Sequence, residues 1–235
     1  MKNFLNDVNF LQTSKDNSST IMELKTFWRK VLPLILCREK HFKCIFKKGT
    51  EKEIFTELIF CIFTPQSRAK LCWEAVKKLI NKNIIFKSTT NDTNDIVKII
   101  HNIRFKNNKA KYVVDAKERF IINGKIKIRE RIEHFENNVY ELREWLKINV
   151  KGIGYKEAGH FLRNIGISKN LAILDRHVLK NLKIYGVIKK IPNTLNKKGY
   201  FKIEKQMQKF SNKIGIPMSH LDMLFWCKNT GVIFK

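Results

Sequence analysis

The sequence predicts an all-α protein, and three observations support this. Only 4 of the 235 residues are proline and 10 are glycine, whereas turn-dense sandwiches and barrels need many of both. Apolar residues recur with helical spacing in most segments, and no segment shows convincing two-residue alternation. A hydrophobic content of 43%, with 17 Phe and 4 Trp, is typical of a folded chain. The length allows one or two small lobes.

The first helix start is marked by a capping box. Thr20 and Glu23 have the spacing at which a hydroxyl and a carboxylate satisfy the free amides of a helix N-terminus. A polar run precedes this box. We therefore expect residues 1–22 to be a flexible N-terminal extension and residues 23–235 to form the helical domain.

A second capping box begins the next helix. Thr50 and Glu53 precede IFTELIFCIF, whose all-round apolar character predicts a central buried helix that ends at Pro65. Thr64 is expected to cap the following helix, with Pro65 in its first turn. Further amphipathic segments are predicted to begin near Thr93, Asn108, Asn138, Tyr155, Asp175, Lys198 and Ser219.

The charge balance indicates a polyanionic partner. The chain has 47 Lys and Arg against 21 Asp and Glu, a net charge of +26. This charge is spread along the chain, whereas binding to a membrane surface usually concentrates it on one amphipathic helix, so nucleic acid is favoured over acidic lipid. No stretch approaches the roughly 20 apolar residues that span a bilayer, and the opening residues lack the apolar core of a leader peptide. We expect a cytoplasmic protein that is associated with the nucleoid through DNA and has no membrane partner.

Neither a disulfide framework nor a metal site is predicted. The five cysteines are an odd number and lack CxxC spacing. The histidines His160, His177 and His220 are not at metal-ligand spacing and are expected to be packed or surface residues. No cofactor and no metal are expected.

A helical hairpin is predicted at about 139–166. An amphipathic segment, VYELREWLKINV, is followed by KGIG and then by YKEAGHFLRNIG, in which helical periodicity resumes at once. Gly152 and Gly154 allow positive φ and close backbone approach, and Ile153 is expected to be buried between them. Amides at the start of the second helix could then face a phosphate. An ordinary αα-hairpin with a glycine cap is the alternative, and the basic charge balance favours DNA.

Two residues near the hairpin are candidates for chemistry. Lys156 lies in the first turn of the second helix, where the helix dipole and neighbouring cations disfavour its ammonium form, so it could be a nucleophile. The alternative is an ordinary solvated lysine. Asp175 follows the apolar Leu171–Leu174 and begins another helix, where an Asp also serves as an N-cap. Both roles are compatible, because a capping carboxylate is rigid and stays ionised.

Several separated motifs resemble the helix-hairpin-helix superfamily of DNA base-excision glycosylases. GIGYKEAGHFLRNIG, LDRHVL, FCIFTPQSRA, RFKNNKAKYVV and LDMLFWCKNTGVIFK are together similar to the archaeal-type (type 2) 8-oxoguanine DNA glycosylase/lyases, from about residue 25 to the last residue. The resemblance implies two helical lobes with the active-site cleft between them. It also implies a monomer that acts on 8-oxoguanine in double-stranded DNA. Lys156 would displace the base and form a Schiff base that permits β-elimination, and Asp175 would assist its deprotonation and stabilise the cationic sugar.

The same resemblance assigns further site residues. Trp226 would stack on the extruded base, the alternative being a core tryptophan. The backbone carboxylate of Lys235 would accept the N7 hydrogen that only 8-oxoguanine carries. Arg104 and Phe105 would fill the gap left by the base and contact the opposite cytosine, unless Phe105 packs in the core and Arg104 is solvated.

The sequence differs from related enzymes in one respect and leaves two other functional interpretations open. The C-terminal cysteine quartet that holds an iron-sulfur cluster in the endonuclease III group is absent, since Cys227 stands alone in that region. Another glycosylase of the same fold could prefer a different damaged base. A non-catalytic helix-hairpin-helix DNA-binding protein would explain the charge and the glycines but not the pairing of Lys156 with Asp175.

Overall fold

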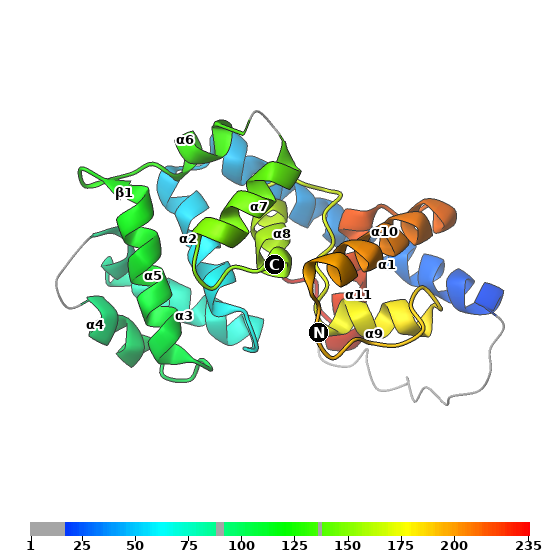
Figure 1. Ribbon diagram of the computed structural model, residues 1–235. Coiled ribbons are helices and arrows are strands. Elements are labelled where there is room, and N and C mark those ends of the chain that lie inside the picture. The colour runs from blue at the N-terminus through cyan, green and yellow to red at the C-terminus, as the bar shows by residue number, and fades with distance from the viewer. Residues whose placement is uncertain (1–16, 88–91, 136–137) are drawn as a thin grey trace. The chain divides into compact units, whose positions relative to one another are not determined.

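The computed structural model describes residues 17–87, 92–135 and 138–235, and the chain divides into two compact units. One unit is continuous, Lys40–Ser168, and the other combines the residues up to Glu39 with Lys169–Lys235 (Figure 1). In chain order, the helices are α1 (Asn17–Lys48), α2 (Glu51–Phe63), α3 (Ala69–Asn81), the short 3-10 helix η1 (Ile84–Phe86), α4 (Asp92–Ile99), α5 (Lys106–Phe120), α6 (Ile128–Glu133), α7 (Val139–Asn149), α8 (Tyr155–Asn164), α9 (Arg176–Ile184), α10 (Lys197–Ile214) and α11 (Met218–Thr230). The predicted all-α class is confirmed.

Helix α2 forms the centre of the continuous unit. Every residue from Ile54 to Phe63 is buried, as the all-round apolar sequence predicts. The predicted capping box at its start is present: the Thr50 amide donates to Glu53 Oε2 at 2.7 Å, and the Glu53 amide donates to Thr50 Oγ1 at 3.2 Å. Helices α3, α5, α6 and α8 pack around α2.

Two predicted helix starts are wrong. Helix α1 begins at Asn17, so Thr20 lies inside the helix and does not cap it. Thr64 is the C-terminal cap of α2, and its hydroxyl donates to the carbonyl of Cys61 at 2.9 Å. Helix α3 begins only at Ala69, because Gln66 takes a left-handed conformation (φ +52°) that no helix accommodates.

The sequence also concealed a small β-hairpin and a short helix. Strands β1 (Ile121–Ile122) and β2 (Lys125–Ile126) pair antiparallel around a turn in which Asn123 and Gly124 both have positive φ, as a two-residue hairpin turn requires. Two-residue strands are too short to show alternation. Helix α6 has only six residues, and its first amides are satisfied from a distance: those of Ile128 and Arg129 donate to Glu51 Oε2 at 2.9 and 3.0 Å.

The second unit is built around α9, α10 and α11. Its inner aromatic stack places Tyr185 against Phe210 and Phe225, with ring centroids 5.9 and 5.7 Å apart. The extended segment Leu171–Leu174 is buried beside α10. The backbone amide and carbonyl of Ala172 are both hydrogen-bonded to side chains of α10.

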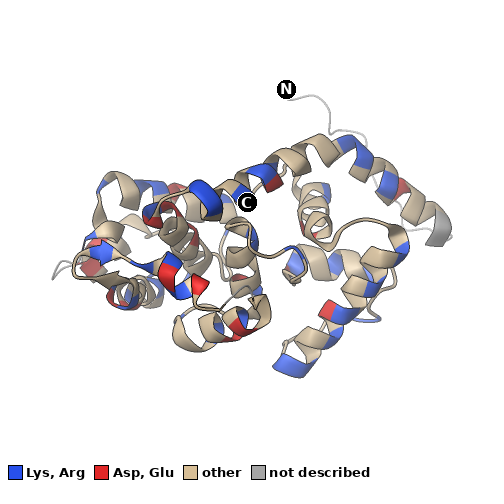
Figure 2. Ribbon diagram, turned by 90° about the horizontal axis from the view of Figure 1, so that it is seen from above, with Lys and Arg blue, Asp and Glu red and all other residues tan. Residues whose placement is uncertain are grey.

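Basic side chains are distributed over the helices of both units (Figure 2). Among the helices of the described residues, none combines the length and the apolar character that crossing a bilayer requires. All five cysteines are free thiols; Cys61, Cys72 and Cys227 are buried. Both units have exposed lysines, for example Lys125 in the continuous unit and Lys183 in the other.

Candidate active site and DNA interface

Of the two glycines in the hairpin turn, Gly152 has the tighter surroundings. Gly152 has φ +82°, and a Cβ atom there would lie 2.6 Å from the ring of Tyr112 on α5. Gly154 has φ −98°, so the expectation that both glycines use positive φ holds for Gly152 alone. Ile153 between them is 5% exposed, as expected of a residue that anchors the turn to the core.

Gly152→Ala should destabilise the protein by about 2 kcal/mol or more. The left-handed backbone costs a residue with a Cβ roughly 1–2 kcal/mol, and the contact with Tyr112 adds to this cost. Gly124→Ala is the matched control, because Gly124 also has positive φ (+72°) but has no atom within 4 Å of the added Cβ. Thermal unfolding of both variants measures the difference in stability. An equal loss of stability in both would show that the Tyr112 ring moves aside at no energetic cost.

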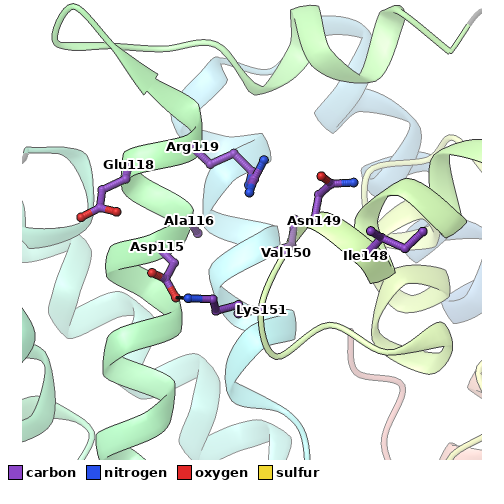
Figure 3. A pocket seen from close by; sticks show the side chains of 8 residues that line it. All are labelled: Asp115, Ala116, Glu118, Arg119, Ile148, Asn149, Val150 and Lys151. Carbon is purple, nitrogen blue, oxygen red and sulfur yellow. Dashed lines mark ion pairs between the residues drawn. The ribbon is translucent and has the colours of Figure 1, made fainter.

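A polar cavity of about 390 Å³ lies beside the hairpin (Figure 3). It separates α5 from the end of α7, and an ion pair closes one side, with Lys151 Nζ 3.0 Å from Asp115 Oδ2. The lining residues are Asp115, Ala116, Glu118, Arg119, Ile148, Asn149, Val150 and Lys151. Lys156 is not among them, so this cavity does not surround the candidate nucleophile.

Lys156 is the second residue of α8, and its side chain is 23% exposed. Its Nζ lies 2.9 Å from Glu157 Oε1, and Glu157 Oε2 accepts a hydrogen bond from the Gly154 amide at 3.2 Å. The helix dipole and the cations near Lys156 disfavour its ammonium form. The Glu157 carboxylate acts in the opposite sense, because an adjacent negative charge stabilises an ammonium.

Glu157 is a site residue that the sequence argument missed. It is 8% exposed, and it connects the amine of Lys156 to the backbone of the hairpin turn. The sequence spacing could have identified Glu157, because a glutamate three residues after a helix cap at Gly154 has capping-box spacing. The amide of Gly154 is therefore engaged within the protein and does not point freely toward a phosphate.

Three other titratable groups lie close enough to Lys156 for its charge to affect them. Burial raises the pKa of Cys72 to about 11 and raises the pKa of Cys61 well above its usual value, while the charge of Lys156 lowers both by a smaller amount. Burial also lowers the pKa of Lys109 to about 8, and Lys156 contributes in the same direction. The amine of Lys156 thus lies near a largely apolar core formed by α2, α3 and α5.

Asp175 belongs to the second unit, where it caps α9. Its Oδ1 accepts from the Val178 amide at 2.7 Å, so the predicted N-cap is present. The preceding segment is held by α10: Tyr200 Oη donates to the carbonyl of Ala172 at 2.6 Å, and the Ala172 amide donates to Glu204 Oε2 at 2.8 Å. A buried, doubly hydrogen-bonded segment therefore delivers the carboxylate to a half-buried position.

Trp226 lies on α11 and is half-buried. Its ring meets His177 edge to face, with centroids 4.8 Å apart. Its Nε1 is buried and has no hydrogen-bond partner among the described residues. Because His177 is two residues after Asp175, it places the tryptophan ring near the start of α9. This packing partner was predicted only as an ordinary histidine.

The C-terminal segment leaves α11 through a glycine turn. Gly231 has φ +75°, and its amide donates to the carbonyl of Cys227 at 2.7 Å. Residues 232–235, including Lys235, are half-buried.

Arg104 and Phe105 form an exposed pair at the start of α5. Phe105 is 50% exposed and adopts a left-handed backbone (φ +59°), which excludes the alternative of a core phenylalanine. The Arg104 guanidinium carbon lies 4.9 Å from the centroid of its ring. A left-handed backbone at a residue other than glycine is costly and persists only where the surrounding structure holds it.

The continuous unit therefore carries the hairpin, Lys156 with Glu157, and the pair Arg104–Phe105, whereas the other unit carries Asp175, Trp226 and Lys235. In the parts of the chain that the structure describes, no group of three or more His, Cys, Asp or Glu side chains is arranged to hold a metal ion.

Comparison with known families decides the relationship of this chain. The family model described as 8-oxoguanine DNA glycosylase matches residues 35–216. The chain belongs to this family. Among curated relatives, the 8-oxoguanine DNA glycosylase/AP lyase of Fusobacterium nucleatum is 41% identical over 213 residues, which cover 91% of this chain and 96% of the relative. That of Methanocaldococcus jannaschii is 36% identical over 217 residues, which cover 92% and 97%.

Solved structures of the 8-oxoguanine DNA glycosylase family have the same fold. The Methanocaldococcus jannaschii 8-oxoguanine glycosylase/lyase in complex with DNA that contains 8-oxoguanine superposes with a TM-score of 0.81 at 32% identity, over 92% of this chain and 100% of that one. The 8-oxoguanine DNA glycosylase of Thermotoga maritima gives a TM-score of 0.80 at 29% identity, over 94% and 100%. The predicted helix-hairpin-helix glycosylase fold is thereby confirmed.

Proposed function

We propose that this protein is a base-excision repair enzyme, a bifunctional glycosylase/AP lyase that removes 8-oxoguanine from double-stranded DNA. The observation that carries the proposal is its membership of the 8-oxoguanine DNA glycosylase family over most of its length. The primary amine of Lys156 on the hairpin, which a lyase requires, supports it. The net charge of +26 supports a DNA partner.

In the proposed reaction, the neutral amine of Lys156 attacks C1′ of the flipped nucleotide, and the bond from C1′ to the base breaks. The bonding electrons leave with the base. The sugar ring then opens to a Schiff base between Nζ and C1′. Loss of a proton from C2′ permits β-elimination, in which the bond to the 3′ phosphate breaks. Glu157, at 2.9 Å from Nζ, is a proposed acceptor for the ammonium proton.

Asp175 is proposed to stabilise the positive charge that develops on the sugar and to assist deprotonation of Lys156. A fixed carboxylate costs no reorganisation when that charge appears. The hydrogen bond from the Val178 amide at 2.7 Å supports this role, because it holds the carboxylate in one orientation.

Base recognition is proposed to involve Trp226 and Lys235. Trp226 offers an aromatic face for stacking on the extruded base. The terminal carboxylate of Lys235 is an acceptor for the N7 hydrogen of 8-oxoguanine and repels the N7 lone pair of guanine. The half-buried position of the C-terminal segment supports a fixed acceptor.

Deleting Lys235 should reduce discrimination against guanine by about tenfold, because the terminal carboxylate moves by one residue. Lys235→Ala is the matched control: it removes the side-chain ammonium but keeps the carboxylate in place. The measurement is the ratio of single-turnover excision rates on 8-oxoguanine and guanine duplexes. An unchanged ratio in the deletion variant, or an equal loss in the alanine variant, would refute the role of the carboxylate.

The proposed DNA interface comprises the hairpin turn, with Gly152, Ile153 and Gly154, and the exposed pair Arg104–Phe105. Phe105 would replace the stacking lost when the base leaves the helix, and Arg104 would donate to the opposite cytosine. We further propose that the protein acts as a monomer, associated with the nucleoid through DNA. The domain division that we propose is an N-terminal extension over 1–22, whose last six residues begin α1, and a two-lobed helical domain over 23–235.

A strand-cleavage assay tests the proposed function. The wild-type protein should cleave a duplex that carries one 8-oxoguanine opposite cytosine, and borohydride should trap a covalent complex. A duplex with another oxidised base tests the alternative of a different lesion preference. Binding without cleavage or trapping on any lesion would indicate a non-catalytic hairpin protein and would overturn the proposal.

A further inference from the structure

Lys109 is a buried lysine that the proposed reaction does not use. It lies on α5 and is 3% exposed. Its Nζ donates to the carbonyl oxygens of Phe63 and Pro65, both at 2.7 Å, and to Ser67 Oγ at 3.0 Å. These three acceptors lie at the end of α2 and in the loop that follows. An ammonium has three hydrogens, so each acceptor receives one.

The same residue is joined to the turn that carries Phe105. The Lys109 amide donates to the carbonyl of Phe105 at 3.0 Å, which forms the first turn of α5. Phe105 has φ +59°, and Gln66 in the loop after α2 has φ +52°. Left-handed backbone at residues other than glycine persists only where the surrounding contacts hold it. Lys109 contacts the segments that contain both residues.

We propose that Lys109 is a positioning residue, whose buried ammonium fastens the Arg104–Phe105 turn to the end of α2 and so presents the Phe105 ring to DNA in one orientation. Lys109 itself is too buried to contact DNA, so it acts through Phe105. The inference rests on the proposed function, since it takes Phe105 as the residue that fills the gap left by the base.

The charge state of Lys109 agrees with this role. Burial lowers its pKa to about 8, Lys156 adds to the lowering, and Cys72 and Glu157 act in the opposite direction. At neutral pH the amine is therefore still an ammonium with a hydrogen for each acceptor. The proximity of Lys156 also defines the competing explanation, in which Lys109 affects catalysis through repulsion between the two ammonium groups.

Hydrogen exchange tests the fastening without requiring activity. In Lys109→Met, amides in the segments 64–68 and 104–109 should exchange about tenfold faster than in the wild type. Amides of α7, at the other side of the hairpin, serve as the internal control and should be unchanged. Exchange that is unchanged in the two segments, or raised equally in α7, would overturn the proposal whether or not the protein excises 8-oxoguanine.

A double-mutant cycle tests the link to Phe105. Lys109→Met and Phe105→Ala should each lower the single-turnover excision rate on an 8-oxoguanine:cytosine duplex by about tenfold, and the double variant should be no slower than the slower single variant. Effects that multiply to about a hundredfold would show that Lys109 acts elsewhere, on Lys156 for example, and would overturn the proposal. Failure of the wild type to cleave would instead refute the proposed function.

Two milder variants keep the test decisive if Lys109→Met does not fold. Ser67→Ala removes one of the three acceptors and should lower the excision rate by about threefold, again without further effect in the Phe105→Ala background. Lys109→Arg retains a charge and several donors and should lose less activity than Lys109→Met. A loss in Lys109→Arg equal to that in Lys109→Met, or a Ser67→Ala effect that persists in the Phe105→Ala background, would contradict the role of the ammonium.

Discussion

Lys156→Gln should abolish the covalent complex that borohydride traps between the protein and an 8-oxoguanine:cytosine duplex. An amide nitrogen cannot form the imine that borohydride reduces, so we expect a trapped yield at least about 10³-fold below that of the wild type. In the wild type, Lys156 Nζ lies 2.9 Å from the Glu157 carboxylate. The Gln side chain retains an N–H group that can donate to this carboxylate, so the hairpin should remain folded. Denaturing gel electrophoresis of the trapped complex measures the yield.

Lys125→Gln is the control for this experiment. Lys125 lies on β2 in the same unit, and its side chain is exposed. Its substitution removes one positive charge, as Lys156→Gln does, and should leave the trapped yield unchanged. If Lys156→Gln retains the wild-type yield, another nucleophile performs the reaction and Lys156 has no covalent role.

Asp175→Asn should lower turnover by on the order of 10²-fold or more while DNA affinity is retained. Removal of one group that stabilises charge in the transition state typically has this effect. Asparagine caps helices about as well as aspartate, so the hydrogen bond from the Val178 amide should survive and the loss should report the charge alone. Single-turnover excision and a fluorescence binding titration provide the two measurements.

Asn196→Asp is the reciprocal control. Asn196 caps α10 by accepting from the Gly199 amide at 2.8 Å, so this variant exchanges the same two residue types at another helix start in the same unit. Its excision rate should match that of the wild type. Near-normal turnover in Asp175→Asn would leave Asp175 with the structural role of an N-cap only.

Helical periodicity predicted most of the fold because most helices bury an amphipathic face. The continuous apolar run after Thr50 identified α2, and α7 and α8 occupy the segments on either side of KGIG. Periodicity could not reveal the β-hairpin, because its two-residue strands are too short to show alternation, or α6, because its first amides are satisfied by a distant residue. Glu51, for example, satisfies the first amides of α6 from 77 residues away.

The candidate site was partly readable in the sequence. Lys156 and Asp175 were chosen from their positions at helix starts, and the structure places both there. The exposure of Phe105, by contrast, follows from its left-handed backbone, which no local sequence pattern predicts. Lys109 was not recognised because its three acceptors lie 42 to 46 residues earlier in the chain.

The division of the chain into a continuous and a discontinuous unit has a consequence for biosynthesis. All of Lys40–Ser168 is translated before α9, so the unit that carries Lys156 can fold before synthesis of the chain is complete. The half that carries Asp175 must wait for α11 before its aromatic stack can close. A polypeptide that ends before α11 is therefore expected to form the unit that carries Lys156 but not the aromatic stack of the unit that carries Asp175.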